Sequence, residues 1–453
     1  MVEEQDALPQ WLAIGGMATV GFTAVRVAGS TISDYLFLAA TGIIALRLLA
    51  GRRANVAPIT SRRTSPTLLL GLGILTAGGL LATMLRSYDP AGSAFVLVRL
   101  WYITIIWFWV VRSVSTSFRT FERLVLAAIV GTIIHSLIGV YQDVSGANMV
   151  YPYWGRSQGL SDHFHDLAVS IGSLLPVLVM WPASRNGGTR KQLLKIAAIL
   201  ITFAGIGTTG AMTALGSVLI GIAVALLAPR LVGSGTGGRR SLVLPASAAV
   251  VVLLTIATGL VDLPVMSRLT ELTEGTNAQV TGSAVGRIEM AEIAIDGAVR
   301  SPIVGVGLDN ISGEAANTFN DMKSADSEQQ LQIHSFYLRI LFEAGIFGLL
   351  GVLLMLFVFF RQVIQLLQIT RNTTLSWLPA GLLGGLVMLC VDGMFGPYLF
   401  ARYFWLPMAL ISGLYGLVKT RGLAGIEPLP RRRTTRAPML LPPMESVPRR
   451  ART

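Results

Sequence analysis

Residues 336–360 read FYLRILFEAGIFGLLGVLLMLFVFF, an apolar run interrupted by only two charged side chains, Arg339 and Glu343. A helix needs about 20 predominantly apolar residues to cross the hydrocarbon core of a bilayer, and this run is long enough. Because lipid offers no partners for backbone N–H and C=O groups, a run that spans it must be helical. Hydrophobic residues make up 53% of the whole chain and charged residues 13%. The sequence therefore predicts an all-α integral membrane protein.

Similar runs recur on both sides of this one, and we expect twelve transmembrane helices in all. The first follows the acidic residues 1–6 and has neither a basic n-region nor a clear cleavage site, so we interpret it as a retained helix. Two short runs meet at a tight turn, Thr208-Thr209-Gly210. The expected spans are residues 11–28, 31–50, 67–86, 93–111, 123–141, 165–182, 193–208, 211–228, 241–260, 336–360, 377–395 and 398–418.

Lysine and arginine are concentrated in every second gap between these runs. Residues 51–66, 112–123, 183–195, 229–240, 361–376 and 419–453 hold 25 of the 36 basic side chains. The alternate gaps hold seven, namely Arg86, Arg156, Arg268, Arg287, Arg300, Lys323 and Arg402. Cytoplasmic loops carry the excess of basic residues, so the pattern predicts that both termini are cytoplasmic. Topology thus accounts for the net charge of +12, and we expect no nucleic-acid partner, the rival interpretation of a basic chain.

Most polar residues expected on the extracytoplasmic side lie in two loops, residues 142–165 and 261–334. In the larger loop, residues 283–299 have the apolar spacing of a helix, Pro302 ends it, and residues 325–333 form a second amphipathic stretch. This loop therefore looks like a folded unit of about two helices. The single cysteine, Cys390, excludes an intramolecular disulfide.

These observations divide the chain into five parts. Residues 1–10 are the cytoplasmic N-terminus, 11–260 the first nine helices, 261–335 the extracytoplasmic loop, 336–418 the last three helices, and 419–453 a basic cytoplasmic tail. The tail is rich in proline and arginine, so we expect it to be disordered and to touch anionic lipid head groups.

Three short motifs in the second half of the chain carry a family resemblance. They are PIVGVG at residues 302–307, HSFYL at 334–338 and GIFGL at 345–349. Together they resemble the bacterial O-antigen ligase and polysaccharide polymerase superfamily of integral membrane glycan transferases. Arg287 matches the loop arginine of that family, while Arg156 and Gly159, with Ala168, match an arginine and glycine of the earlier outer loop. The resemblance covers residues 156–402.

The sequence departs from the family pattern at three places. Ser335 and His165 stand where asparagine is usual, and Thr208-Thr209-Gly210 lacks the common Ser-Arg pair. These differences affect the expected substrate contacts more than the expected reaction class.

The resemblance implies an enzyme that takes a glycan from undecaprenyl diphosphate and passes it to an acceptor hydroxyl at the outer face of the cytoplasmic membrane. Negative charge builds on the diphosphate leaving group, so fixed cations must face it. Arginine suits phosphate oxygens. Arg156 and Arg287 are the candidates, with Arg99 and Arg402 as helpers. His334 would orient or deprotonate the acceptor hydroxyl. No Asp-x-Asp pattern lies beside these residues, so we expect a metal-independent reaction without a cofactor.

Each candidate also has a purely structural interpretation. Arg287 would pair with Glu289 or Glu292, and His334 would cap its helix. Arg156 would anchor to head groups beside Tyr153 and Trp154. Arg99 and Arg402 would snorkel, and Asp392 would pair with Arg402. The acid-flanked pair His163 and His165 has some metal-site character, but its ligand set is incomplete.

Two functions within one reaction class, and one from another class, stay open at this point. A ligase would pass the glycan to a lipid, protein or other envelope acceptor, in lipopolysaccharide or exopolysaccharide biosynthesis. A polymerase would pass it to another lipid-linked repeat unit. By analogy with the layout of one large, late loop, we favour the ligase. A flippase for lipid-linked glycans would show an internal repeat, and the sequence has none that we detect.

Overall fold

A computed structural model describes residues 7–50, 65–147, 155–182, 188–231, 278–310, 333–424 and 426. Within these ranges the chain is almost entirely helical, with one two-stranded hairpin. The span expected at 241–260, the loop residues 261–277, most of the stretch 325–333, and the tail from 427 onward lie outside the described residues.

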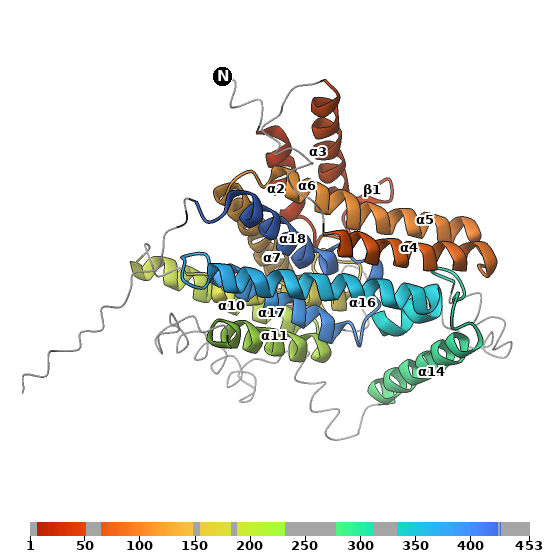
Figure 1. Cartoon of the computed structure of the whole chain (residues 1–453). Coiled ribbons are helices and arrows are strands. Elements are labelled where there is room, and N and C mark those ends of the chain that lie inside the picture. Colours follow the sequence, from red (N-terminus) through yellow and green to blue (C-terminus); the bar gives the residue numbers. More distant parts are fainter. Residues whose placement is uncertain are drawn as a thin grey trace, which may run out of the picture.

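Seven helices of the described part are long and apolar enough to cross a membrane, judged by length and composition. They are α3 (Ile32–Leu49), α4 (Pro66–Leu85), the run of α5 (Pro90–Trp101), η2 (Tyr102–Trp107) and α6 (Phe108–Val114), α7 (Phe118–Ser145), α10 (Gly188–Thr208), α11 (Met212–Leu231) and α16 (Phe336–Thr370). Each coincides with a predicted span. Figure 1 shows α4, α5 and α16 running side by side.

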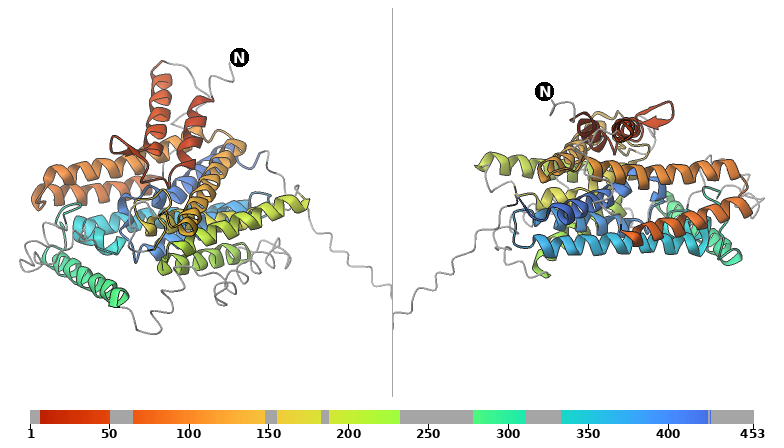
Figure 2. Two further views of the ribbon diagram at one scale, coloured as in Figure 1. Left: turned by 180° about the vertical axis from the view of Figure 1, so that it is seen from behind. Right: turned by 45° about the horizontal axis from the view of Figure 1, so that its top comes forward.

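The remaining helices are shorter or interrupted. They are α2 (Leu8–Ala18), α8 (Phe164–Gly172), α9 (Leu175–Met180), α14 (Ala278–Arg300), α17 (Trp377–Asp392), the short η4 (Tyr398–Phe400) and α18 (Arg402–Arg421). The span predicted at 165–182 is thus divided between α8 and α9. In each of the three views, α2 and α3 lie on one side of the bundle and α14 on the opposite side (Figures 1 and 2).

The first predicted span, residues 11–28, is wrong in its second half. Helix α2 ends at Ala18, and the Thr19 hydroxyl donates to the carbonyl of Gly15 at 3.0 Å. The chain then forms a hairpin in which β1 (Arg26–Val27) pairs antiparallel with β2 (Ser30–Thr31). Ala28 and Gly29 form the two-residue turn with φ values of 47° and 80°, the left-handed conformation that such hairpins require.

Glycines bring the backbones of α4 and α16 together. A Cβ at Gly78 would lie 2.7 Å from the Gly348 nitrogen, and one at Gly71 would lie 3.0 Å from the Gly351 carbonyl oxygen. Small residues at such crossings allow close packing where lipid provides no hydrophobic drive for helix association. The GIFGL motif therefore serves partly to dock α16 on α4.

Helix α16 is broken at Gly345, where φ is 66° and ψ is −167°. The PIVGVG turn fills the break, because Val306 donates to the Phe342 carbonyl at 3.0 Å and Ile346 donates to the Pro302 carbonyl at 2.9 Å. A Cβ at Gly305 would lie 2.6 Å from the Glu343 carbonyl oxygen. Two glycine motifs that are separate in the sequence are thus one backbone-to-backbone contact in the structure.

The alternate loops gather at opposite ends of the helices. At one end, which we call the site end, Asn310 contacts Ser87 and Ser93, and Phe336 donates to the Gly393 carbonyl at 2.8 Å. The helix ends that border the basic gaps lie toward the other end, where α4 begins and α6, α16 and α18 finish. This separation agrees with the alternation of charge in the sequence.

Candidate functional site

His334 lies at the junction of α16 and α17. Ser335, not His334, is the N-cap of α16, because its hydroxyl accepts from the Leu338 nitrogen at 3.4 Å. The next two residues fix the junction: Phe336 donates its N–H to the Gly393 carbonyl, and the Tyr337 hydroxyl donates to the Cys390 carbonyl at 2.9 Å. The helix-capping interpretation of His334 is therefore wrong, and its half-buried imidazole is left for another role.

Arg287 is an exposed residue of α14, the helix predicted at 283–299. That helix packs on the outer part of α16 through an apolar cluster whose members include Met290, Ile293, Ala294 and Phe342. Gly297 allows the close approach, since a Cβ there would collide with the Phe342 ring. Packing of α14 against α16 therefore sets where Arg287 stands relative to His334.

Arg156 is buried, with 7% of its surface exposed. Its Nε donates to the Thr209 carbonyl at 2.6 Å, and its guanidinium carbon lies 3.2 Å from the centre of the Phe164 ring. Burial argues against the head-group anchor interpretation. The Thr208-Thr209-Gly210 turn, which departs from the family pattern, holds this arginine in place.

Helix α7 holds the loop that carries Arg156. The Gln142 side chain accepts from the Gly159 nitrogen at 2.8 Å and donates to the Gly159 carbonyl at 2.9 Å. Gly159 has a φ of 59°, and a Cβ there would lie 2.6 Å from a carbon of His135. Only glycine meets both conditions without strain, which gives a physical reason for the glycine that follows Arg156.

Two histidines of the earlier loop share an electrostatic environment with His334 and the arginines. Burial lowers the pKa of His163 to about 3, helped by His165, Arg156, His334 and Arg287 in that order. Burial likewise lowers the pKa of His334 to about 4, helped by Arg287 and then His165. Both imidazoles are therefore neutral at pH 7. The five side chains, which come from three separate segments, form the candidate site.

Buried polar atoms without partners lie beside this cluster. Among the residues that the structure describes, Ser157 Oγ, Gln158 Oε1 and His165 Nε2 are buried and make no hydrogen bond. Buried polar groups are normally satisfied, so their clustering at one place is typical of a site that binds a polar ligand.

Asp392 lies beside the candidate site, and the partner predicted for it is wrong. It is fully buried at the end of α17 and accepts a hydrogen bond from the Tyr398 hydroxyl. Its Oδ2 lies 3.3 Å from His165 Nε2, within ion-pair distance but without hydrogen-bond geometry. The expected pair of Asp392 and Arg402 is absent. A carboxylate at the end of an apolar span is itself a signal of function, and that signal could have marked Asp392.

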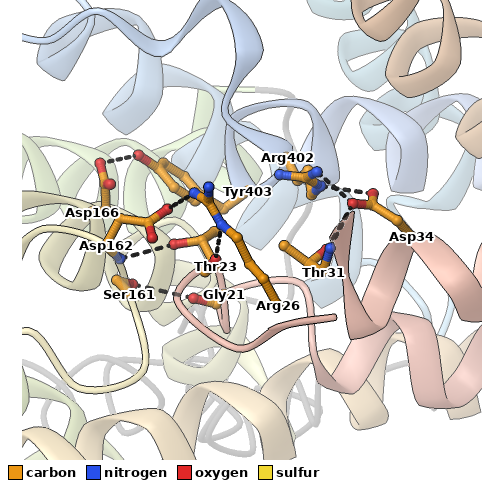
Figure 3. Close-up of polar contacts among 10 residues, drawn as sticks. All are labelled: Gly21, Thr23, Arg26, Thr31, Asp34, Ser161, Asp162, Asp166, Arg402 and Tyr403. Carbon is orange, nitrogen blue, oxygen red and sulfur yellow. Dashed lines mark hydrogen bonds and ion pairs between the residues drawn. The ribbon is translucent and has the colours of Figure 1, made fainter. Parts of the chain in front are cut away.

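Arg402 pairs instead with Asp34 (Figure 3). Its Nε donates to Asp34 Oδ1 at 2.7 Å, and its Nη2 contacts Oδ2. Thr31, the N-cap of α3, also donates to Asp34, from its backbone nitrogen at 3.0 Å and its hydroxyl at 2.9 Å. Both side chains are at least nine-tenths buried. This pair ties α18 to α3.

Arg99 lies on α5, half-buried, within electrostatic range of Arg402, Asp34, Arg26 and Asp162. Among the residues that the structure describes, it has no hydrogen-bond or ion-pair partner. Its guanidinium is therefore available to an anion, in contrast to that of Arg402.

The acids that flank His163 and His165 have partners of their own. Asp162 pairs with Arg26 of the hairpin, and its nitrogen donates to the Thr23 hydroxyl at 3.1 Å. Asp166 accepts from the Tyr403 hydroxyl at 2.5 Å. The contacts of Asp162, with that of Ser161 and Gly21, join the hairpin and the residues before it to the loop of Arg156, while that of Asp166 joins α8 to α18 (Figure 3). Within the described ranges no group of three or more His, Cys, Asp or Glu side chains is placed to hold a metal.

Comparison with known families bears directly on this arrangement. Residues 194–353 match a family model described as O-antigen ligase. This segment contains Arg287, the PIVGVG turn, His334 and the broken part of α16, but not Arg156, Arg99 or Arg402. No curated protein matches the chain. The match confirms the resemblance to the O-antigen ligase and polysaccharide polymerase superfamily, and with the apolar helices it supports a membrane glycosyltransferase of this general type.

Proposed function

We propose that the chain transfers a glycan from undecaprenyl diphosphate to an acceptor hydroxyl at the outer face of the cytoplasmic membrane, as an O-antigen ligase-like enzyme. The observation that carries the proposal is the convergence of Arg156, Arg287 and His334 in one electrostatic environment at the site end of the helices. The charge pattern of the loops supports an extracytoplasmic position for that end.

The two arginines have the chemistry to receive the leaving group. As the bond between the anomeric carbon and the diphosphate oxygen breaks, its electron pair moves to the diphosphate. Positive groups that are already fixed stabilise this charge without having to reorganise. Arg156 is such a group, because Thr209 and Phe164 hold it. Arg287 is exposed on α14, where it can meet the donor.

His334 has the protonation state that the acceptor half of the reaction needs. Its lowered pKa leaves the imidazole neutral at pH 7, so one ring nitrogen can accept the proton of the acceptor hydroxyl as its oxygen bonds to the anomeric carbon. We propose this role, or orientation of the same hydroxyl, for His334. No metal or cofactor enters the scheme.

Arg99 and Arg402 differ as helpers. Because Arg99 has no hydrogen-bond or ion-pair partner in the described part of the chain, we assign it a diphosphate contact at the edge of the site. Arg402 already pairs with Asp34. We therefore give it lower priority as a diphosphate ligand than Arg156, Arg287 and Arg99, and assign it the role of holding α18 in position.

The direct test uses purified protein, a labelled undecaprenyl-diphosphate oligosaccharide and candidate acceptors added singly. We expect His334→Ala and Arg287→Ala to abolish transfer while expression and membrane insertion stay normal. Arg300→Ala is the matched control, because Arg300 is exposed on the same helix and pairs with Asp296. Unchanged turnover in both site variants would refute the assignment.

The same assay separates the ligase from the polymerase. With donor alone, a ladder of longer lipid-linked chains would identify a polymerase. An unchanged donor that reacts only when a lipid, protein or other glycan acceptor is supplied would identify a ligase. Translocation of donor across a vesicle membrane without any transfer would identify the flippase instead.

A further inference from the structure

A polar cavity lies at the opposite end of the helices from the candidate site. Its volume is about 340 Å³, and four helices line it: the first turn of α4, the last turn of α6, and the later parts of α16 and α18. Among the residues that the structure describes, the lining includes two arginines, Arg112 and Arg361, and no acidic side chain. This described lining therefore has a net positive charge.

The other lining groups are hydrogen-bonding side chains. Gln362 is 5% exposed, and its Oε1 has no partner among the residues that the structure describes. Gln365 accepts from the Tyr415 hydroxyl at 2.8 Å, and Thr67 adds a hydroxyl at the start of α4. Arg112 lies along α18 where Gly416 has no side chain, since a Cβ there would be 3.5 Å from its Nε. Two guanidinium groups with amides and hydroxyls match a phosphate group and a hydroxylated head group.

The depth of the cavity favours a lipid as the source of that phosphate. After its break at Gly345, helix α16 continues for 25 residues, 346–370, or about 37 Å at 1.5 Å per residue, which exceeds a hydrocarbon core of about 30 Å. Arg361 and Gln365 lie toward the end of this segment, and we place them at the level of the lipid head groups, where basic side chains are favoured. One turn away on the same helices, Leu70 and Phe357 are more than half exposed and offer an apolar surface to acyl chains.

We propose that this cavity binds the phosphate head group of an anionic phospholipid in the leaflet opposite the candidate active site. Arg112 and Arg361 bind the phosphate, while Gln362, Gln365 and Tyr415 bind the rest of the head group. The site is separate from the glycan-transfer site and does not depend on that assignment. It stabilises the packing of α4, α6, α16 and α18 at this end.

The test is lipid retention by the full chain, measured by native mass spectrometry, together with melting temperature in phosphatidylcholine nanodiscs with and without phosphatidylglycerol. We expect phosphatidylglycerol to bind in preference to phosphatidylcholine and to raise the melting temperature. The Arg112→Gln/Arg361→Gln variant should bind phosphatidylglycerol at least about tenfold more weakly, from the loss of two cationic contacts.

Two further variants separate a built site from general surface charge. Arg119→Gln/Arg371→Gln removes the same charge from exposed positions at the same end outside the cavity, and it should retain the lipid. Thr67→Phe keeps the charge but fills the cavity, and it should lose the lipid. Equal loss in the exposed-arginine control, or equal binding of phosphatidylcholine, would overturn the proposal. Displacement of phosphatidylglycerol by millimolar inorganic phosphate would also overturn it, because the phosphate would then come from solution.

Discussion

The pair of Arg402 and Asp34 allows a test that separates a structural arginine from a diphosphate ligand. The two side chains are 8% and 4% exposed. Removing one partner of a buried ion pair costs about 3–5 kcal/mol, because the other charge stays buried without compensation. Thr31 continues to donate to Asp34, which places Arg402→Gln toward the lower end of that range. The exposed pair of Arg26 and Asp162, 45% and 41% exposed, should contribute only about 0–1 kcal/mol.

The assay is the free energy of unfolding in mixed micelles titrated with a denaturing detergent, on Arg402→Gln, Asp34→Asn, the double variant and Arg26→Gln. We expect each single change in the buried pair to destabilise strongly, the double variant to recover most of the loss, and Arg26→Gln to change little. If Arg402→Gln costs no more than Arg26→Gln, the burial argument is refuted. If the double variant is stable but transfers poorly, with a raised KM for the donor, Arg402 contacts the diphosphate.

Three more outcomes are expected. The transfer rate should be constant from pH 8 to pH 6 and fall with an apparent midpoint near pH 4, because the pKa of His334 is lowered to about 4 and only its neutral form accepts a proton. Arg287→Gln should move this midpoint upward in any residual activity. A wild-type midpoint near pH 6.5 would contradict the burial of His334. Gly345→Ala should cost at least about 1–3 kcal/mol of unfolding free energy for its left-handed backbone alone, with a collision against the Ile303 carbonyl in addition, whereas Gly73→Ala, which meets no atom within 4 Å, should not destabilise. Asn310→Ala should cost about 1–3 kcal/mol in the same titration, because Asn310 donates to Ser87 and Ser93 at 2.7 and 2.6 Å and these partners lose a buried hydrogen bond; a change near zero would show that water replaces the amide.

Hydropathy predicted where most helices lie but not where they stop or break. The run from 336 contains nothing that marks Gly345 as non-helical, because its conformation is imposed by the PIVGVG turn from another segment. The early end of α2 has a local cause in Thr19 and the following hairpin, but an apolar stretch from 11 to 28 hides it. A twelve-helix count rests on residues 241–260, which lie outside the described part of the chain.

In the candidate site, too, features set by local sequence could be predicted, and contacts between distant segments could not. His334 and the glycine turn could be proposed from sequence because each lies in a short motif, and Arg287 because it precedes that turn and matches an arginine of the family pattern. The partner of Arg402 could not, because Asp34 is 368 positions away and a nearer acid, Asp392, offered a plausible alternative. The hydrogen bond from Arg156 to the Thr209 carbonyl could not be predicted from sequence either, because any residue supplies a backbone carbonyl.

The break in α16 also has a consequence for how chains of this kind can diverge. Residues 302–310 reach α16 through their own backbone, and α14 reaches it through Phe342. These contacts, and not the length of chain between Asn310 and Ile333, therefore set the position of Arg287 relative to His334. We expect insertions or deletions there to leave the two proposed site residues in place, whereas a single added residue between Arg300 and Gly307 should shift one of them relative to the other. Selection on this site should therefore leave variable chain length between Asn310 and Ile333 and strictly kept spacing between Arg300 and Gly307.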